Sequence, residues 1–126
     1  MASKKEVFGV DVNGDISGLA KAMKDAERLM KSAQRSLKNI NDAVQLNPTD
    51  DKLLQEQRDV YKQAIKENEQ ALKGLYNIRK QIVNDPNFKK GITDMSEKFT
   101  SVEKEIQRVT AEGKKVKAEF NKLPSE

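Results

Sequence analysis

The chain has 126 residues, of which 36% are hydrophobic and 35% are charged, and it contains no histidine, cysteine or tryptophan. This composition excludes disulfide bonds, a cysteine nucleophile and zinc sites built on histidine or cysteine. The 24 lysines and arginines outnumber the 20 acidic residues, and the two signs are interspersed along the chain. Because nucleic-acid readers cluster their cations and a spanning helix needs about 20 successive apolar residues, neither nucleic acid nor membrane is an expected partner.

Residues 1–14 are predicted to form an extended arm or a short β-strand. Phe8, Val10 and Val12 alternate with glycine or polar residues, which is the period of a strand. Because no second strand is predicted, these three residues form a candidate docking edge for another subunit or protein. A leader without a docking role is the alternative.

The run over 11–15 places oxygen-bearing side chains at the first, third and fifth positions of a calcium-binding loop. Such a loop needs a glycine at its sixth position and a glutamate at its twelfth. This chain has Ile16 and Ala22 there. We therefore expect no calcium site, and Asp15 is instead predicted to cap the first helix.

The first helix is predicted over residues 15–46. Nine apolar residues recur at alternating spacings of three and four, the period of a helix with one apolar face. Pro48 disfavours the helical conformation at Asn47, so the helix is expected to end there. The apolar positions are Ile16, Leu19, Met23, Ala26, Met30, Ala33, Leu37, Ile40 and Val44.

The second helix is predicted over residues 50–83, and its apolar face is broader. One row contains Leu54, Tyr61, Ile65, Leu72, Leu75 and Ile82, and an adjoining row contains Leu53, Val60, Ala64, Ala71 and Ile78. A helix that contacts two neighbours needs a broad apolar face, so this one is predicted to be central. Asn68 interrupts the first row, either as a buried polar group that sets the register or as a solvated edge position; the sequence favours the edge. A tetratricopeptide repeat is disfavoured, because no proline breaks the segment.

The third helix is predicted over residues 94–123, where Asp94 and Glu97 have the spacing of a capping box. Gly113 falls within the apolar series and marks either a close helix crossing or a weak point. Lys114, Lys115 and Lys117 are expected on the solvent face. The apolar positions are Ile92, Met95, Phe99, Val102, Ile106, Val109, Val116, Phe120 and Leu123.

The three apolar series together predict an all-α fold of long antiparallel coiled-coil helices. The helices form either a three-helix up-down-up rod or a helical hairpin with a third helix, because short connections join sequential neighbours in antiparallel fashion. Residues 15–123 form this domain. The apolar series are the candidate packing or self-assembly seam. No catalytic residue, cofactor, metal site or small-molecule substrate is predicted.

The helix start Gly14-Asp15-Ile16-Ser17-Gly18-Leu19 and the turn Leu46-Asn47-Pro48-Thr49-Asp50 lie at the beginning and end of a heptad helix. With the long helix that follows, they resemble the amino-terminal region of tail tape measure proteins of long-tailed bacteriophages. The resemblance covers about residues 7–83. It is carried by the helix start at 14–19, by the turn at 46–50, by Leu53, Leu54 and Gln57, and by the long helix through Leu72 and Leu75. Residues 84–126 carry no signal of that family.

The resemblance implies a structural protein that occupies the tail tube lumen and sets tail length. It implies self-association, contact with tail tube or tail assembly chaperone proteins, and a place in the virion tail, assembled in the bacterial host cytoplasm. Family members have many hundreds of residues, so the chain is expected to be an amino-terminal fragment or a small relative.

Two other classes of helical protein share parts of this pattern. A secreted helical-hairpin adaptor of Gram-positive bacteria usually carries a Trp-x-Gly turn, whereas this chain has the turn Asn47-Pro48-Thr49 and no tryptophan. A spectrin-like bundle matches three helices of about thirty residues but usually places tryptophan in its core. The secreted adaptor is retained as the alternative function.

Overall fold

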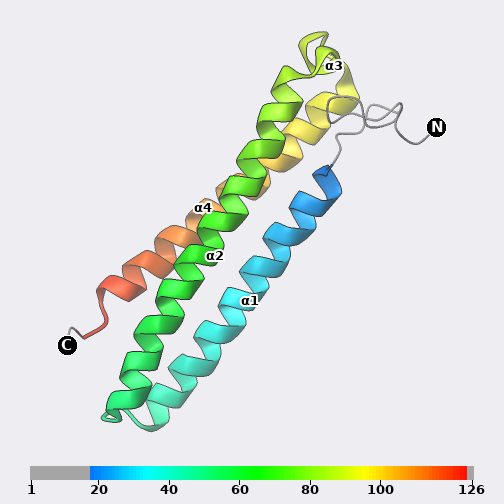
Figure 1. Cartoon of the computed structure of the whole chain (residues 1–126). Helices are drawn as coiled ribbons and strands as arrows, with labels where there is room; N and C mark the ends of the chain where they lie inside the picture. The colour runs from blue at the N-terminus through cyan, green and yellow to red at the C-terminus, as the bar shows by residue number, and fades with distance from the viewer. Residues whose placement is uncertain (1–17, 125–126) are drawn as a thin grey trace.

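A computed structural model of the chain describes residues 18–124. Three long helices and one short one make up its regular structure: α1 (Leu19–Leu46), α2 (Asp51–Asn84), α3 (Pro86–Lys89) and α4 (Thr93–Asn121). α1 and α2 form an antiparallel hairpin, and α4 runs back along α2 (Figure 1). The predicted all-α, up-down-up arrangement is confirmed for this part of the chain. The predicted strand with its docking edge Phe8, Val10 and Val12, the run over 11–15, and Ile16 lie outside the described residues.

α2 is the central helix, as its broad apolar face predicts. It packs against both α1 and α4, whereas α1 and α4 approach each other at few points. Leu75 and Ile82 on α2 are completely removed from solvent. α2 has 34 residues, and a helix of that length extends for about 50 Å, so the bundle is elongated.

The first helix begins later than predicted. Gly18 has a φ of +83°, in the left-handed region, and α1 starts at Leu19 with no side-chain cap. A residue with that φ interrupts a right-handed helix, and glycine adopts it without the steric penalty of a Cβ atom. Within the described residues the helix therefore begins at Leu19, and the predicted start at residue 15 with its Asp15 cap falls outside residues 18–124.

The turn between α1 and α2 follows the sequence closely. α1 ends at Leu46, the residue before the Asn47-Pro48 pair. Asp50 then caps α2, because its side chain accepts a hydrogen bond of 3.1 Å from the main-chain nitrogen of Leu53. Such a cap satisfies one of the amides that a helix leaves unpaired at its first turn.

The second connection contains a helical turn that was not predicted from the sequence. Buried Asp85 caps α3 by accepting a hydrogen bond of 2.7 Å from the nitrogen of Asn87. Pro86 occupies the first position of that helix, where its fixed φ is favourable. The predicted capping box at Asp94 is wrong: α4 begins after Ile92, and Asp94 pairs instead with Lys98 at 2.6 Å.

The core consists of two apolar clusters along the rod. The upper cluster, which is the one nearer α3, joins all three long helices through side chains such as Met30, Leu75 and Val102, and Phe88 of α3 packs against it. The lower cluster, which is the one nearer the α1–α2 turn, contains Leu37 and Val116.

Leu37 and its neighbour Lys38 provide a matched test of the assigned face. Leu37 is 7% exposed within the lower cluster, whereas Lys38 points outward and pairs with Asp42 at 2.8 Å. We expect Leu37→Ala to lower the free energy of unfolding by about 2–4 kcal/mol, because it removes buried methyl groups and leaves a cavity. Lys38→Ala should change it by less than about 0.5 kcal/mol. Thermal melts followed by circular dichroism measure both, and equal effects would contradict the assigned face.

Candidate assembly seam

The predicted seam is buried inside a single chain rather than presented on its surface. Ten of its residues are buried: Met30, Leu37, Ile40, Tyr61, Leu75, Ile82, Met95, Val102, Ile106 and Val109. Eight are half-buried: Leu19, Met23, Val44, Leu54, Ile65, Leu72, Phe99 and Phe120. The heptad pattern is therefore used by the chain's own bundle, and the seam is a packing seam.

The second apolar row of α2 contributes as much to the core as the first. Ala64, Ala71 and Ile78 are all buried. Alanine at two of these positions lets the neighbouring helix approach closely. Because both rows contain buried residues, neither row alone predicts the core.

α2 and α4 approach each other closely where Asn68 lies against Gly113. The Nδ2 group of Asn68 donates a hydrogen bond of 2.7 Å to the main-chain oxygen of Val109, and it lies 3.7 Å from the sulfur of Met30 on α1. A Cβ atom added at Gly113 would lie 2.4 Å from the Asn68 Oδ1 atom. Only glycine leaves room for the amide at this position.

This geometry resolves both alternatives that the sequence left open. Asn68 is 6% exposed, so its assignment to a solvated edge is wrong. It is a buried polar group with a satisfied donor, as such groups must be if their burial is not to be strongly unfavourable. Gly113 marks a close helix crossing and not a weak point.

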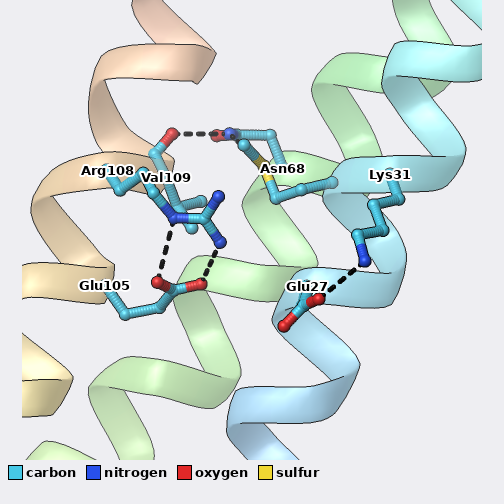
Figure 2. Close-up of polar contacts among 7 residues, drawn as sticks. Glu27, Lys31, Asn68, Glu105, Arg108 and Val109 are labelled. Atoms are coloured by element: carbon cyan, nitrogen blue, oxygen red, sulfur yellow. Dashed lines mark hydrogen bonds and ion pairs between the residues drawn. The ribbon is translucent and has the colours of Figure 1, made fainter.

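Ion pairs lie along the same three long helices. Arg79 of α2 pairs with Glu103 of α4 at 2.7 Å. Within α4, the Arg108 Nε atom donates to Glu105 at 3.0 Å, and within α1, Lys31 pairs with Glu27 at 2.7 Å (Figure 2). The hydrogen bond from Lys31 lowers the pKa of the Glu27 carboxyl group. These exposed or half-exposed pairs contribute little stability individually.

A second polar group of residues links the three long helices at the end of the bundle near the α1–α2 turn. Gln57 donates to the Asn41 oxygen at 2.8 Å, and Asn41 donates to the Tyr61 hydroxyl oxygen at 3.0 Å. Tyr61 in turn donates to Glu119 of α4 at 3.1 Å. Burial raises the pKa of the Tyr61 hydroxyl. Tyr61 is a predicted seam residue, but its polar partners Asn41 and Glu119 were not predicted, because they come from two other helices.

Three further observations concern metal binding, membrane crossing and the lysines of α4. Over residues 18–124, no group of three or more acidic, histidine or cysteine side chains is arranged to hold a metal ion. No helix in that range is both long and apolar enough to cross a membrane. Lys114, Lys115 and Lys117 lie exposed beside buried Val116, as predicted.

Comparisons with known proteins give no family for this chain. No profile of a protein family matches it, and neither a curated protein nor a solved structure matches.

Two glycines of the bundle are expected to respond in opposite ways to the same substitution. Gly113→Ala should lower the free energy of unfolding by about 1–2 kcal/mol, since the overpacking against Asn68 outweighs the better helix propensity of alanine. Gly74→Ala should raise it by about 0.5–1 kcal/mol, because a Cβ atom there meets nothing within 4 Å. Chemical denaturation measures both changes.

A double substitution tests the cause of the Gly113 effect. If the added methyl group clashes with the Asn68 amide, Asn68→Ala/Gly113→Ala should be more stable than the sum of the two single changes predicts. Additive effects would contradict a direct contact between these residues.

The hydroxyl of Tyr61 is predicted to stabilise the fold in its neutral form. Tyr61→Phe should cost about 1–2 kcal/mol, because it removes the hydrogen bonds to Asn41 and Glu119. Tyr76→Phe is the matched control. Tyr76 is 42% exposed, so removal of its hydroxyl group should change the free energy of unfolding little.

The chain has two tyrosines, so Tyr76→Phe also isolates the titration of Tyr61. The ultraviolet absorbance of this variant should show ionisation above the ordinary tyrosine pKa of 10.0. Because the folded-state pKa is raised, the contribution of Tyr61 to stability is fully present below the ordinary value and is lost as the pH rises through the folded pKa. An ordinary pKa for Tyr61 would contradict its burial.

Proposed function

We propose that this chain is a structural protein of bacteriophage tail assembly. In this proposal it is the amino-terminal part of a tape measure protein, or a small relative, that lies in the lumen of the tail tube. It acts there by length, packing and binding, without catalysis. Its location is the virion tail, assembled in the cytoplasm of the bacterial host.

The α1–α2 hairpin is the observation that supports the proposal most directly. The resemblance depends on a heptad helix, a turn at 46–50 and a second heptad helix. α1 ends at Leu46 and α2 begins at Asp51, so these sequence features coincide with real boundaries of the structure. The elongated bundle is also a suitable shape for a protein that is enclosed in a tube.

The buried seam limits how the chain contacts its partners in this proposal. Because the apolar series pack within one chain, contacts with further copies, with tail tube proteins or with a tail assembly chaperone must use the solvent faces and the ends of the bundle. Leu46 at the α1–α2 turn is 81% exposed, and Ile92 at the opposite end is 45% exposed. These two apolar side chains are the natural points for end-to-end contacts.

An in-frame deletion in the encoding genome tests the proposal. Removal of the codons for residues 19–121 should give particles with no tails or with tails of abnormal length, as seen by electron microscopy. Supplying the wild-type chain from a plasmid should restore normal tails. The double change Leu46→Ser/Ile92→Ser should weaken co-purification with the tail tube protein or the chaperone, while the thermal melt stays unchanged.

Normal tails after the deletion would reject the tail-assembly proposal. A second outcome would favour the alternative function: recovery of the chain from the medium of a Gram-positive host, dependent on its secretion genes. That result would identify the protein as a secreted helical-hairpin adaptor.

A further inference from the structure

All cations of α1 lie in one row along the helix. Their spacings alternate between three and four residues, and the row contains Lys21, Lys24, Arg28, Lys31, Arg35 and Lys38. It extends for about 25 Å at the rise of an α-helix. All six residues are exposed. Residues at these spacings share one face of a helix, and this face is opposite the buried residues Met30, Ala33 and Leu37.

Nearby carboxylates neutralise this basic row only in part. Asp25 pairs with Lys21 at 2.7 Å and lies 3.7 Å from Arg28. Glu27 and Asp42 pair with the other two engaged cations of the row, Lys31 and Lys38. Within residues 18–124, Lys24 and Arg35 have no such partner. α1 therefore has six cations against three anions on its surface.

A groove runs beside this row, between α1 and α2. Its volume is about 500 Å³, and it is open to solvent. The small residues Ala22, Ala26 and Gly74 line it, together with Leu29. Nothing lies within 4 Å of where a Gly74 Cβ atom would stand, so the groove has free space beside Gly74.

The opposite rim of the groove is also basic. Lys73 of α2 lines the groove across from Lys21 and Arg28. Lys66 and Lys80 lie seven residues to either side of Lys73, at the same heptad position, and all three are exposed. No ion-pair partner for these three lysines is found within residues 18–124. The groove thus has a floor of small and apolar residues between two rims on which cations outnumber the single carboxylate, Asp25, that pairs with Lys21 and Arg28.

We propose that the α1–α2 groove is a docking site for an acidic amphipathic helix of a partner protein. The small and apolar residues of the floor accept apolar side chains of that helix, and the glutamates or aspartates of the helix reach the rims at Lys21, Arg28 and Lys73. Helix-in-groove binding uses this combination of an apolar face and flanking charges. The proposal does not depend on the tail-assembly function.

Two other occupants fit this surface less well. A nucleic-acid backbone has no apolar face to cover Leu29 and the alanines of the groove. A second copy of this chain has no free acidic row among its described helices. Three carboxylates lie seven residues apart on one side of α4, at Glu105, Glu112 and Glu119. They accept hydrogen bonds from Arg108, Gln34 and Tyr61, respectively.

A designed peptide tests the proposal on the full chain. The probe is a fluorescein-labelled peptide of three Ala-Glu-Ala-Leu-Glu-Ala-Glu heptads, and the reference peptide has lysine in place of each glutamate. Fluorescence anisotropy should show saturable binding of the acidic peptide only. Lys21→Glu/Arg28→Glu/Lys73→Glu should weaken this binding about ten-fold or more, the combined effect of three exposed charge pairs. The same variant should gain affinity for the lysine peptide, which shows that it is folded and that the rims make the contact.

Two further variants separate docking in the groove from general attraction between charges. Lys114→Glu/Lys115→Glu/Lys117→Glu makes the same change in net charge on α4 and should bind the acidic peptide like the wild type. Gly74→Leu fills the groove without changing any charge. It should weaken binding about ten-fold, with no loss of thermal stability, because its side chain points into open space.

Four results would overturn the proposal. The first is no saturable binding of the acidic peptide to the wild type. The second is an equal loss of binding in the α4 variant or no loss in Gly74→Leu. The third is tighter binding of a mixed-sequence DNA duplex that is unaffected by Gly74→Leu, which would make the basic row a nucleic-acid surface. The fourth is self-association in sedimentation that the groove variants abolish, which would make a second copy the occupant.

Discussion

The contact between the Asn68 amide and the backbone of α4 fixes the register of α4 along α2. The amide is buried and donates to the Val109 carbonyl, and the absence of a Cβ atom at Gly113 gives it room. If α4 slid by one residue along α2, the amide would lose its acceptor and meet a side chain, and both changes are unfavourable. Met30 of α1 touches the same amide, so the surroundings of one side chain fix the axial positions of all three long helices relative to one another.

The polar contacts distinguish this arrangement from others that the apolar pattern allows. A three-four repeat of apolar residues permits several registers and orientations, whereas a buried polar group is satisfied in only one of them. Asn68 has this role at the centre of the bundle. The hydrogen bonds from Gln57 through Asn41 and Tyr61 to Glu119 have the same role near the α1–α2 turn. The two apolar clusters supply most of the burial, and these polar contacts select how it is arranged.

Burial of the seam leaves the solvent faces for contacts with other molecules. The outward face of α1 carries the basic row, and the groove beside it has basic residues on both rims. The charges of the whole chain are interspersed, a pattern that predicts an even surface. The helical period instead gathers the cations of α1 on one side, because residues three and four apart are neighbours in space although opposite charges lie between them in sequence.

The sequence by itself determined the number of the main helices, the turn between the first two, their apolar faces and the central position of α2. These are local properties: a period of three and four residues, a proline after Asn47, and a broad apolar stripe. The cap and proline that begin α3, Asp85 and Pro86, are also a local signal, although no helix was predicted there. The sequence named the seam residues, but only the tertiary structure decided that they pack within one chain. It also decided that Asn68 is buried and that Gly113 is a crossing point. Whether a position at the edge of an apolar face is solvated depends on which helix lies against it and how closely, and no pattern within one helix contains that information.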